Sequence, residues 1–110
     1  MAGQLTTHAL DTAKGVGCAG LKVHVRRGDA VLTTAVLDAR GRANLLDGLE
    51  PGVYEIVFGA ADYHRSIGEA LSEPPFLDEV TIRFGVGDPD AHYHVPLLLT
   101  PWSYSTYRGG

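Results

Sequence analysis

Apolar and polar residues alternate with a period of two along most of this chain, and this feature constrains its fold most strongly. In the stretch 21–26 the odd positions hold leucine and valine, and the even positions hold lysine, histidine and arginine. Successive side chains of a β-strand point to opposite faces, so this pattern is typical of a strand with one buried face. The alternation returns at 53–58 and 80–84, which predicts an all-β protein.

Turn signals divide this pattern into about seven to eight strands. Gly28 and Asp29 separate the strand at 21–26 from a second strand at 30–39, which ends before Gly41, and we expect the two to pair as a hairpin. The strand at 53–58 is apolar on both faces, which predicts a central position in its sheet. Further strands are expected at 5–11, 80–84, 92–99 and 103–108.

One helix is predicted, in the segment "ADYHRSIGEALSE" at 61–73. Asp62 can cap its start, and Pro74 ends it. Its apolar side would hold Tyr63, Ile67, Ala70 and Leu71. With 110 residues, the chain is expected to form a single domain, 1–110, folded as an antiparallel β-sandwich with one short helix.

Composition narrows the classes of partner and location. The net charge of −4 gives no basic field for nucleic acid, and no apolar run approaches the roughly 20 residues that a membrane span needs. The start, "MAGQLTTHALD", lacks the basic and apolar regions of a secretory signal. The one cysteine, Cys18, is expected to be a buried, inert thiol. These features predict a cytoplasmic protein that binds neither nucleic acid nor membrane.

The five histidines raise the question of a metal site. His92 and His94 share one face of a strand, but two ligands are too few for a closed zinc site, and no HExxH pattern occurs. We therefore expect no metal and no cofactor. His24 lies on a polar strand face and His64 lies early in the helix, so both are predicted to be surface residues.

Two histidines remain as candidates for chemistry. His8 could be a hydrogen-bonded structural residue or a functional one, and the pattern alone favours the structural role. Pro96 cannot donate a ladder hydrogen bond, so the strand at 92–99 should be an edge or be locally irregular, where His94 could point into a cleft. The arginines of "RGRAN" and "YRGG" could lie in plain turns or could bind an anion.

Four segments carry a resemblance to a known family: "LTTHALD", "DARGRANL", "GVYEIVF" and "YHVPLLLTPWSYSTYRGG". In order and spacing they resemble the transthyretin-related 5-hydroxyisourate hydrolases of urate breakdown. The family's usual ending, Tyr-Arg-Gly-Ser, distinguishes these hydrolases from hormone-carrying transthyretin. The resemblance implies a transthyretin-like sandwich and hydrolysis of a cyclic amide, which converts 5-hydroxyisourate to 2-oxo-4-hydroxy-4-carboxy-5-ureidoimidazoline.

The resemblance also implies a site. The family's catalytic residues fall on His8, Arg42 and His94, with Arg40 as the neighbouring alternative to Arg42. We assign His94 as the general base and His8 as its partner, although the sequence does not fix that order. The family's substrate-binding motif falls on Tyr107, Arg108 and Gly109. A homotetramer is implied, with active sites between dimers that take a small anionic substrate.

The chain departs from the family in a few places, and two other functions compete. Gly110 stands where the family has serine, Thr100 replaces another serine, and Trp102 replaces a tyrosine. The first alternative is a transthyretin-like carrier without chemistry, which would lack the histidines, the arginine and the closing motif. The second is an immunoglobulin-like interaction sandwich, which leaves the polar residues of the last strand unexplained.

Overall fold

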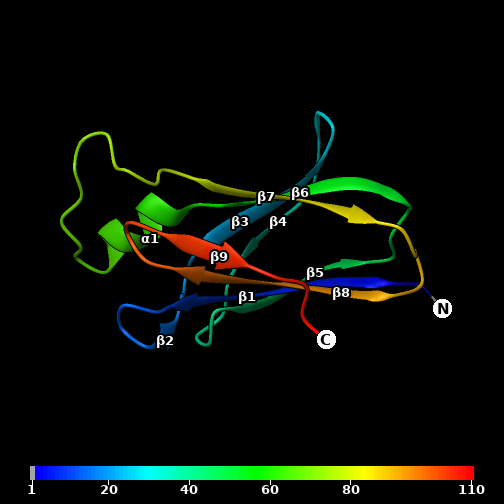
Figure 1. The fold of residues 1–110 in the computed structure, drawn as a ribbon, viewed down its shortest axis with the longest axis horizontal. Helices are drawn as coiled ribbons and strands as arrows, with labels where there is room; N and C mark the ends of the chain where they lie inside the picture. Colours follow the sequence, from blue (N-terminus) through cyan, green and yellow to red (C-terminus); the bar gives the residue numbers. More distant parts are fainter. Residues whose placement is uncertain (1) are drawn as a thin grey trace.

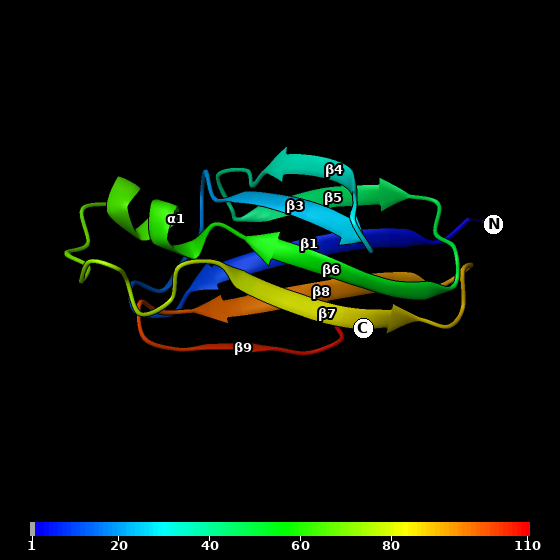
Figure 2. The same ribbon diagram turned by 90° about the horizontal axis from the view of Figure 1, so that it is seen from above.

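Two β-sheets packed face to face make up the fold in the computed structural model, which describes residues 2–110 (Figure 1). The first sheet contains β1 (Gln4–Asp11), β2 (Val16–Gly17), β5 (Arg42–Asp47), β8 (His92–Leu99) and β9 (Tyr104–Thr106). The second contains β3 (Lys22–Arg27), β4 (Ala30–Val36), β6 (Gly52–Phe58) and β7 (Val80–Val86). The helix α1 (Ala60–Ser66) follows β6 at one end (Figure 2). The predicted sandwich is confirmed.

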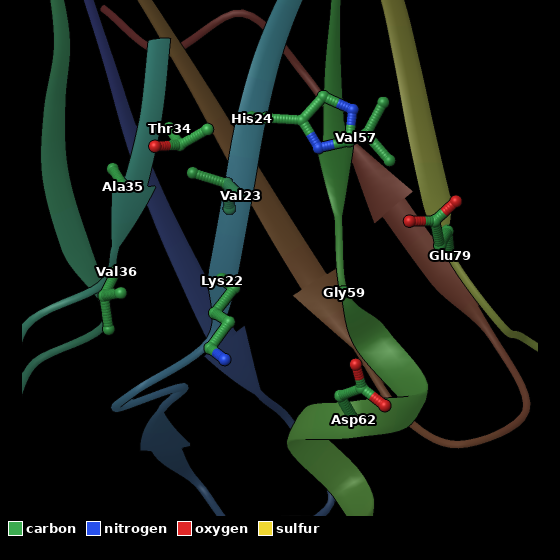
Figure 3. A pocket seen from close by; sticks show the side chains of 10 residues that line it. All are labelled: Lys22, Val23, His24, Thr34, Ala35, Val36, Val57, Gly59, Asp62 and Glu79. Atoms are coloured by element: carbon green, nitrogen blue, oxygen red, sulfur yellow. The ribbon is translucent and has the colours of Figure 1, made fainter.

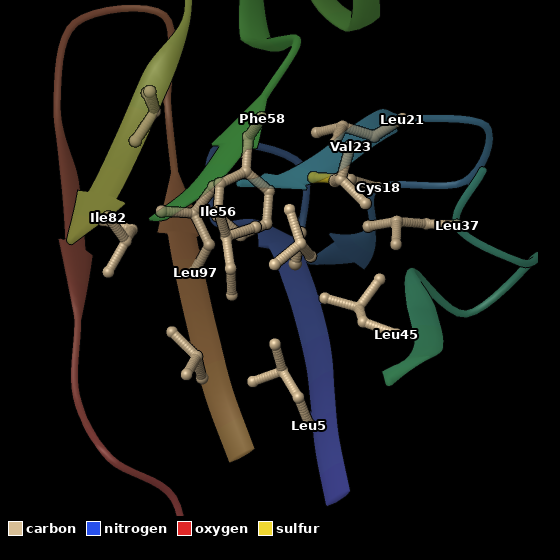
Figure 4. Close-up of a cluster of buried hydrophobic side chains, with 14 of the residues drawn as sticks. Leu5, Cys18, Leu21, Val23, Leu37, Leu45, Ile56, Phe58, Ile82 and Leu97 are labelled. Carbon is tan, nitrogen blue, oxygen red and sulfur yellow. The ribbon is translucent and has the colours of Figure 1, made fainter. Parts of the chain in front are cut away.

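The core lies between the sheets, and the alternation in the sequence places its side chains there. Leu21, Val23 and Val25 are at most 3% exposed, as the pattern at 21–26 predicts. Ile56 and Phe58 of β6 and Leu97 of β8 point into the same space (Figure 4). Each such side chain contributes about 2 kcal/mol through burial. β6 is flanked by β3 and β7, so its predicted central position is confirmed.

β1 lies at the centre of the first sheet and fixes the register of its neighbours. It pairs with β8 in parallel, placing Thr6 opposite His94, and with β5 antiparallel, placing His8 opposite Arg42. This parallel ladder differs from the antiparallel pairing expected of neighbouring strands. β1 and β8 are far apart in sequence, with β2 to β7 and the helix between them, so no tight turn dictates their direction.

The strands after Gly41 and around Pro96 differ in part from the prediction. The segment after Gly41 forms a strand, β5, which the sequence pattern did not predict. β8 has the predicted bounds, and its ladder with β9 covers only Leu97 to Leu99. The carbonyl of Pro96 accepts a hydrogen bond from the Thr106 hydroxyl at 2.7 Å instead. The predicted local irregularity at Pro96 therefore lies on the β9 side.

The helix is shorter than predicted. α1 begins after Gly59 without a side-chain cap, so Asp62 lies in its first turn rather than at the cap. It ends at Ser66, with Ile67 as its C-cap, because Gly68 adopts a left-handed conformation with φ of +86°. Ala70 and Leu71 therefore lie outside the helix. Within residues 2–110, none of the helices has the length and apolar character needed to cross a membrane.

The prediction that His64 is a surface residue is wrong. His64 is 1% exposed, and neither ring nitrogen has a hydrogen-bond partner among the described residues. Its ring meets that of Tyr63 edge-on, with centroids 5.3 Å apart. The Tyr63 hydroxyl in turn donates to the buried Asp11 carboxylate at 2.9 Å. The helix is thereby anchored to the end of β1.

Candidate active site

A hollow of about 480 Å³ lies on the face of the first sheet that points away from the core. Three predicted catalytic residues meet in it: His8 from β1, Arg42 from β5 and His94 from β8. The other residues that line it are Thr6, Thr7, Asp38, Ala43, Asn44, His92 and Gly110. The structure therefore brings together His8, Arg42 and His94, which are up to 86 residues apart in sequence.

The turn before β5 brings Arg42 opposite His8 in the β1–β5 ladder. Gly41 has a φ of +78°, and a Cβ atom there would collide with the carbonyl oxygen of Ala9, so only glycine permits this close approach to β1. The Asp38 carboxylate accepts hydrogen bonds from the backbone N–H groups of Arg40 and Arg42 at 2.9 and 3.0 Å. These two bonds lower the pKa of Asp38 and keep the carboxylate charged. The turn is thus fixed by the close approach of Gly41 to β1 and by the hydrogen bonds to Asp38.

The neighbouring alternative, Arg40, has a different position. Its carbonyl oxygen lies 2.9 Å from Nε2 of His8, and its side chain does not line the hollow. A carbonyl can only accept, so Nε2 of His8 must carry the hydrogen. A neutral His8 then has its lone pair on Nδ1. The geometry favours Arg42 over Arg40 as the arginine of the site, and Arg40 acts through its backbone.

His94 lies in a setting that opposes protonation. Burial is the largest cause that lowers its pKa below the ordinary 6.5, and the positive charges of His92, His8 and Arg42 add to it. The ring is therefore neutral at pH 7 and can accept a proton. Its Nδ1 lies 2.8 Å from Oγ1 of Thr6, and the same Oγ1 lies 2.8 Å from Nε2 of His92.

The predicted substrate-binding residues divide into two groups. Gly109 lies beside the hollow, where its N–H donates to the His94 carbonyl at 2.7 Å. Arg108 instead places its guanidinium 4.2 Å from the centre of the Tyr93 ring. Together with Tyr107 it lines a separate hollow between β7 and β8. Within one chain, Tyr107 and Arg108 are not brought to His8, Arg42 and His94.

Besides Thr7, whose side chain is buried and donates to the Val95 carbonyl, four polar residues of the hollow were not predicted: Thr6, Asp38, Asn44 and His92. Thr6, Asn44 and His92 each stand two positions from a predicted residue on the same strand. Residues at i and i+2 of a strand share a face, so this spacing could have found them. Within the chain from residue 2 onward, no group of three or more His, Cys, Asp or Glu side chains is placed to hold a metal ion.

A second hollow, of about 490 Å³, lies on the outer face of the other sheet (Figure 3). Lys22 and His24 of β3 face it together with Asp62 of the helix and Glu79. Of the described residues that line this hollow, one is a histidine and none is an arginine. It therefore lacks the combination of two bases and a guanidinium that the first hollow has.

Comparison with known proteins finds both hydrolases and transthyretins among the similar proteins. Residues 5–109 match the profile of the HIUase/Transthyretin family. A Deinococcus radiodurans protein named 5-hydroxyisourate hydrolase is 52% identical over 113 residues, which cover 96% of this chain and 94% of that protein. The structure of Klebsiella pneumoniae 5-hydroxyisourate hydrolase matches with a TM-score of 0.86 and 30% identity, covering 97% of this chain and 99% of that one. Sea bream transthyretin in complex with thyroxine matches with a TM-score of 0.83 and 28% identity, covering 96% and 93%.

Proposed function

Because the chain belongs to the HIUase/transthyretin family, we propose that it is a 5-hydroxyisourate hydrolase of urate degradation. It opens a cyclic amide of 5-hydroxyisourate with water and gives 2-oxo-4-hydroxy-4-carboxy-5-ureidoimidazoline. The observation that carries this proposal is the hollow in which His8, Arg42 and His94 meet. Such a hydrolysis needs a base for water, a positive group for the oxyanion and a proton for the leaving nitrogen.

His94 is the proposed general base. A neutral imidazole can take a proton from water, and the lowered pKa of His94 keeps it neutral at pH 7. The resulting Nε2–H can then donate to the leaving ring nitrogen. His8 is the proposed partner, because its hydrogen bond to the Arg40 carbonyl leaves Nδ1 as an acceptor that can orient the same water.

Arg42 supplies the fixed positive charge. Its guanidinium stays protonated at any working pH and presents planar donors that match the edge of a urate-like anion. The same group would stabilise the oxyanion as water adds to the carbonyl carbon. The β1–β5 ladder supports this role, because it sets Arg42 opposite His8 on neighbouring strands.

We propose a homotetramer with its sites at the interface between dimers. The hollow is an open depression of the sheet surface, so a second chain packed on this face would enclose the substrate and exclude water. Tyr107 and Arg108 line a different hollow of the same chain. Their predicted contact with the substrate therefore requires a neighbouring subunit. A cytoplasmic location also belongs to the proposal, and the single buried Cys18, which forms no disulfide, agrees with it.

A carrier without catalytic activity is the second candidate, because the fold matches that of transthyretin closely. The polar lining of the hollow argues against it, because His8, His94 and Arg42 supply the proton acceptors and the positive charge that hydrolysis needs and that binding alone does not. The chain is also 52% identical to the Deinococcus radiodurans hydrolase, compared with 28% to sea bream transthyretin.

An ultraviolet assay tests the proposal. Urate is oxidised in place by a urate oxidase, and the decay of the 5-hydroxyisourate absorbance is followed with and without the protein. We expect the wild-type chain to accelerate the decay and the His8→Ala/His94→Ala double variant to leave it at the spontaneous rate. If the wild type does not accelerate the decay, the hydrolase proposal fails, and a carrier or a protein that has lost the activity remains. A monomer in size-exclusion chromatography would rule out a site shared between subunits.

A further inference from the structure

The Thr6 hydroxyl joins two histidines of the hollow. Oγ1 lies 2.8 Å from Nε2 of His92 and 2.8 Å from Nδ1 of His94. The two rings lie 6.3 Å apart with their planes inclined by 60°, so the hydroxyl is their bridge rather than a direct contact. The strand register explains this arrangement, because β1 places Thr6 opposite His94 and Gln4 opposite His92.

The number of available hydrogens restricts how Thr6, His92 and His94 can form hydrogen bonds with one another. A hydroxyl has one hydrogen to donate, so Thr6 can donate to only one histidine and must accept from the other. If His94 donates from Nδ1, its Nε2 holds a lone pair and can act as a base. If Thr6 donates to Nδ1, Nε2 of His94 carries a hydrogen and cannot take a proton from water. The chemistry proposed above requires the first arrangement.

We propose that His94, Thr6 and His92 form a proton relay, with His92 as its outer end. In the resting state His94 Nδ1–H donates to Thr6 Oγ1, and the Thr6 hydroxyl donates to Nε2 of His92. The inference rests on the proposed hydrolase function and gives His92, which the family resemblance left without a role, a place in the mechanism. Thr6 and His92 are positioning residues that act through His94.

Every proton that moves in the proposed step has a donor and an acceptor. As a water O–H bond breaks, its proton goes to Nε2 of His94 and the hydroxide oxygen bonds to the substrate carbonyl carbon. The Nδ1 proton of His94 passes to Thr6 Oγ1, and the Thr6 hydroxyl proton passes to Nε2 of His92. His94 is then neutral and carries its hydrogen on Nε2. When that proton moves to the leaving nitrogen, the relay runs backwards and restores the resting state.

The advantage of the relay lies in where the positive charge goes. His94 is half-buried and close to Arg42, so an imidazolium there is disfavoured by lost hydration and by like charge. Within the subunit His92 is more exposed than His94, so an imidazolium on His92 loses less of its hydration. Transfer through Thr6 therefore moves the charge from the less favourable ring to the more favourable one.

Kinetics of matched variants test the relay. Thr6→Val keeps the shape of the side chain and removes the hydroxyl, so we expect kcat to fall about 100-fold with KM within about twofold of wild type. Thr6→Ser restores a hydroxyl and should recover most of the loss. His92→Gln can still accept from Thr6 but cannot hold a proton, and should lose kcat as Thr6→Val does. Thr81→Val, on the exposed face of β7, is the control and should leave kcat unchanged.

A proton inventory separates a relay from a structural role. Rates in mixtures of H₂O and D₂O should curve for the wild type, because several protons move together, and should become linear for Thr6→Val. Nitrogen-15 NMR of the imidazoles provides a second readout that needs no turnover. The wild type should show His94 protonated on Nδ1, and Thr6→Val should shift it towards Nε2–H.

The outcomes distinguish the relay from the function on which it rests. An active wild type whose Thr6→Val variant keeps both kcat and a curved inventory would overturn the relay and leave the hydrolase proposal intact. An inactive wild type would remove the hydrolase and the relay step together, and the NMR experiment would still decide whether the hydrogen-bonded chain exists. A wild-type His94 protonated on Nε2 would contradict the proposed resting state.

Discussion

Gly109 lies directly against the ring of His94. Its N–H donates to the His94 carbonyl at 2.7 Å, and a Cβ atom at position 109 would stand 2.5 Å from Cδ2 of the ring. The closing segment of the chain thus touches both the backbone and the side chain of the proposed base. A glycine is needed here for closeness rather than for an unusual backbone angle.

Substituting Gly109 should therefore displace the base. In Gly109→Ala the new methyl group pushes the His94 ring away, and a shift of about 1 Å lowers kcat/KM about 100-fold. Gly85→Ala is a matched control on β7, because a Cβ atom there meets nothing within 4 Å. Steady-state kinetics of the two variants check the prediction, and equal activity would show that His94 tolerates the contact.

Removing any member of the proposed catalytic set should abolish most of the activity. We expect His8→Ala, Arg42→Ala and His94→Ala each to lose about 10²-fold to 10⁴-fold in kcat/KM while the proposed tetramer still forms. All three side chains lie on the outer face of the sheet, so the core is unaffected. His24→Ala, on the other sheet, is the control. Near-normal turnover in one variant would remove that residue from the mechanism.

The pH dependence should reflect the suppressed protonation of His94. Neutral His94 is the active form and its pKa lies below 6.5, so kcat/KM should persist as the pH falls through 6.5 and decline only at lower pH. His92→Gln removes one neighbouring positive charge, which raises the pKa of His94 and moves the acidic limb towards 6.5. If kcat/KM of the wild type already declines above pH 6.5, a group other than His94 is responsible for the decline.

Loss of the Tyr63 hydroxyl should destabilise the protein without changing its chemistry. The hydroxyl donates to buried Asp11, so Tyr63→Phe leaves the carboxylate short of one donor and costs about 1–3 kcal/mol of unfolding free energy. Urea unfolding measures the change. Because neither Tyr63 nor Asp11 lines the hollow, kcat/KM of the folded variant should match wild type, and a fall in both stability and kcat/KM would link the helix anchor to the site.

Cys18 should be inert in the folded protein. Burial, with the charge of Asp11 as a second cause, raises the pKa of its thiol to about 12, so almost no thiolate exists at neutral pH. A disulfide reagent at pH 8 should react slowly with the native chain and rapidly after unfolding in guanidinium. Rapid reaction of the native protein would indicate that the segment around Cys18 opens easily.

Much of the fold follows from local pattern alone. The alternation at 21–26 predicts which side chains enter the core, because a strand offers only two faces. The turn at Gly28 and Asp29 predicts the β3–β4 hairpin, which is confirmed. By contrast, the parallel pairing of β1 with β8 depends on contacts between distant segments, and no short-range signal encodes it.

The errors have equally local causes. The apolar periodicity continues past Gly68 and predicts a longer helix, whereas the left-handed conformation of this glycine ends it. The position of His64 early in the helix predicts a surface residue, whereas the side chain is buried in the fold. In the hollow, the family resemblance provided His8, Arg42 and His94, but the role of Thr6 depends on register across two strands.

β1 carries core residues and site residues in strict alternation, since Leu5, Thr7 and Ala9 are buried while Thr6 and His8 face the hollow. If every residue of this strand were substituted in turn, the effects would thus fall into two sets that alternate along the sequence. Odd positions would govern how much folded protein accumulates in the cell, and even positions would govern how fast each molecule works. Selection acting on one property could leave the other untouched, one residue away.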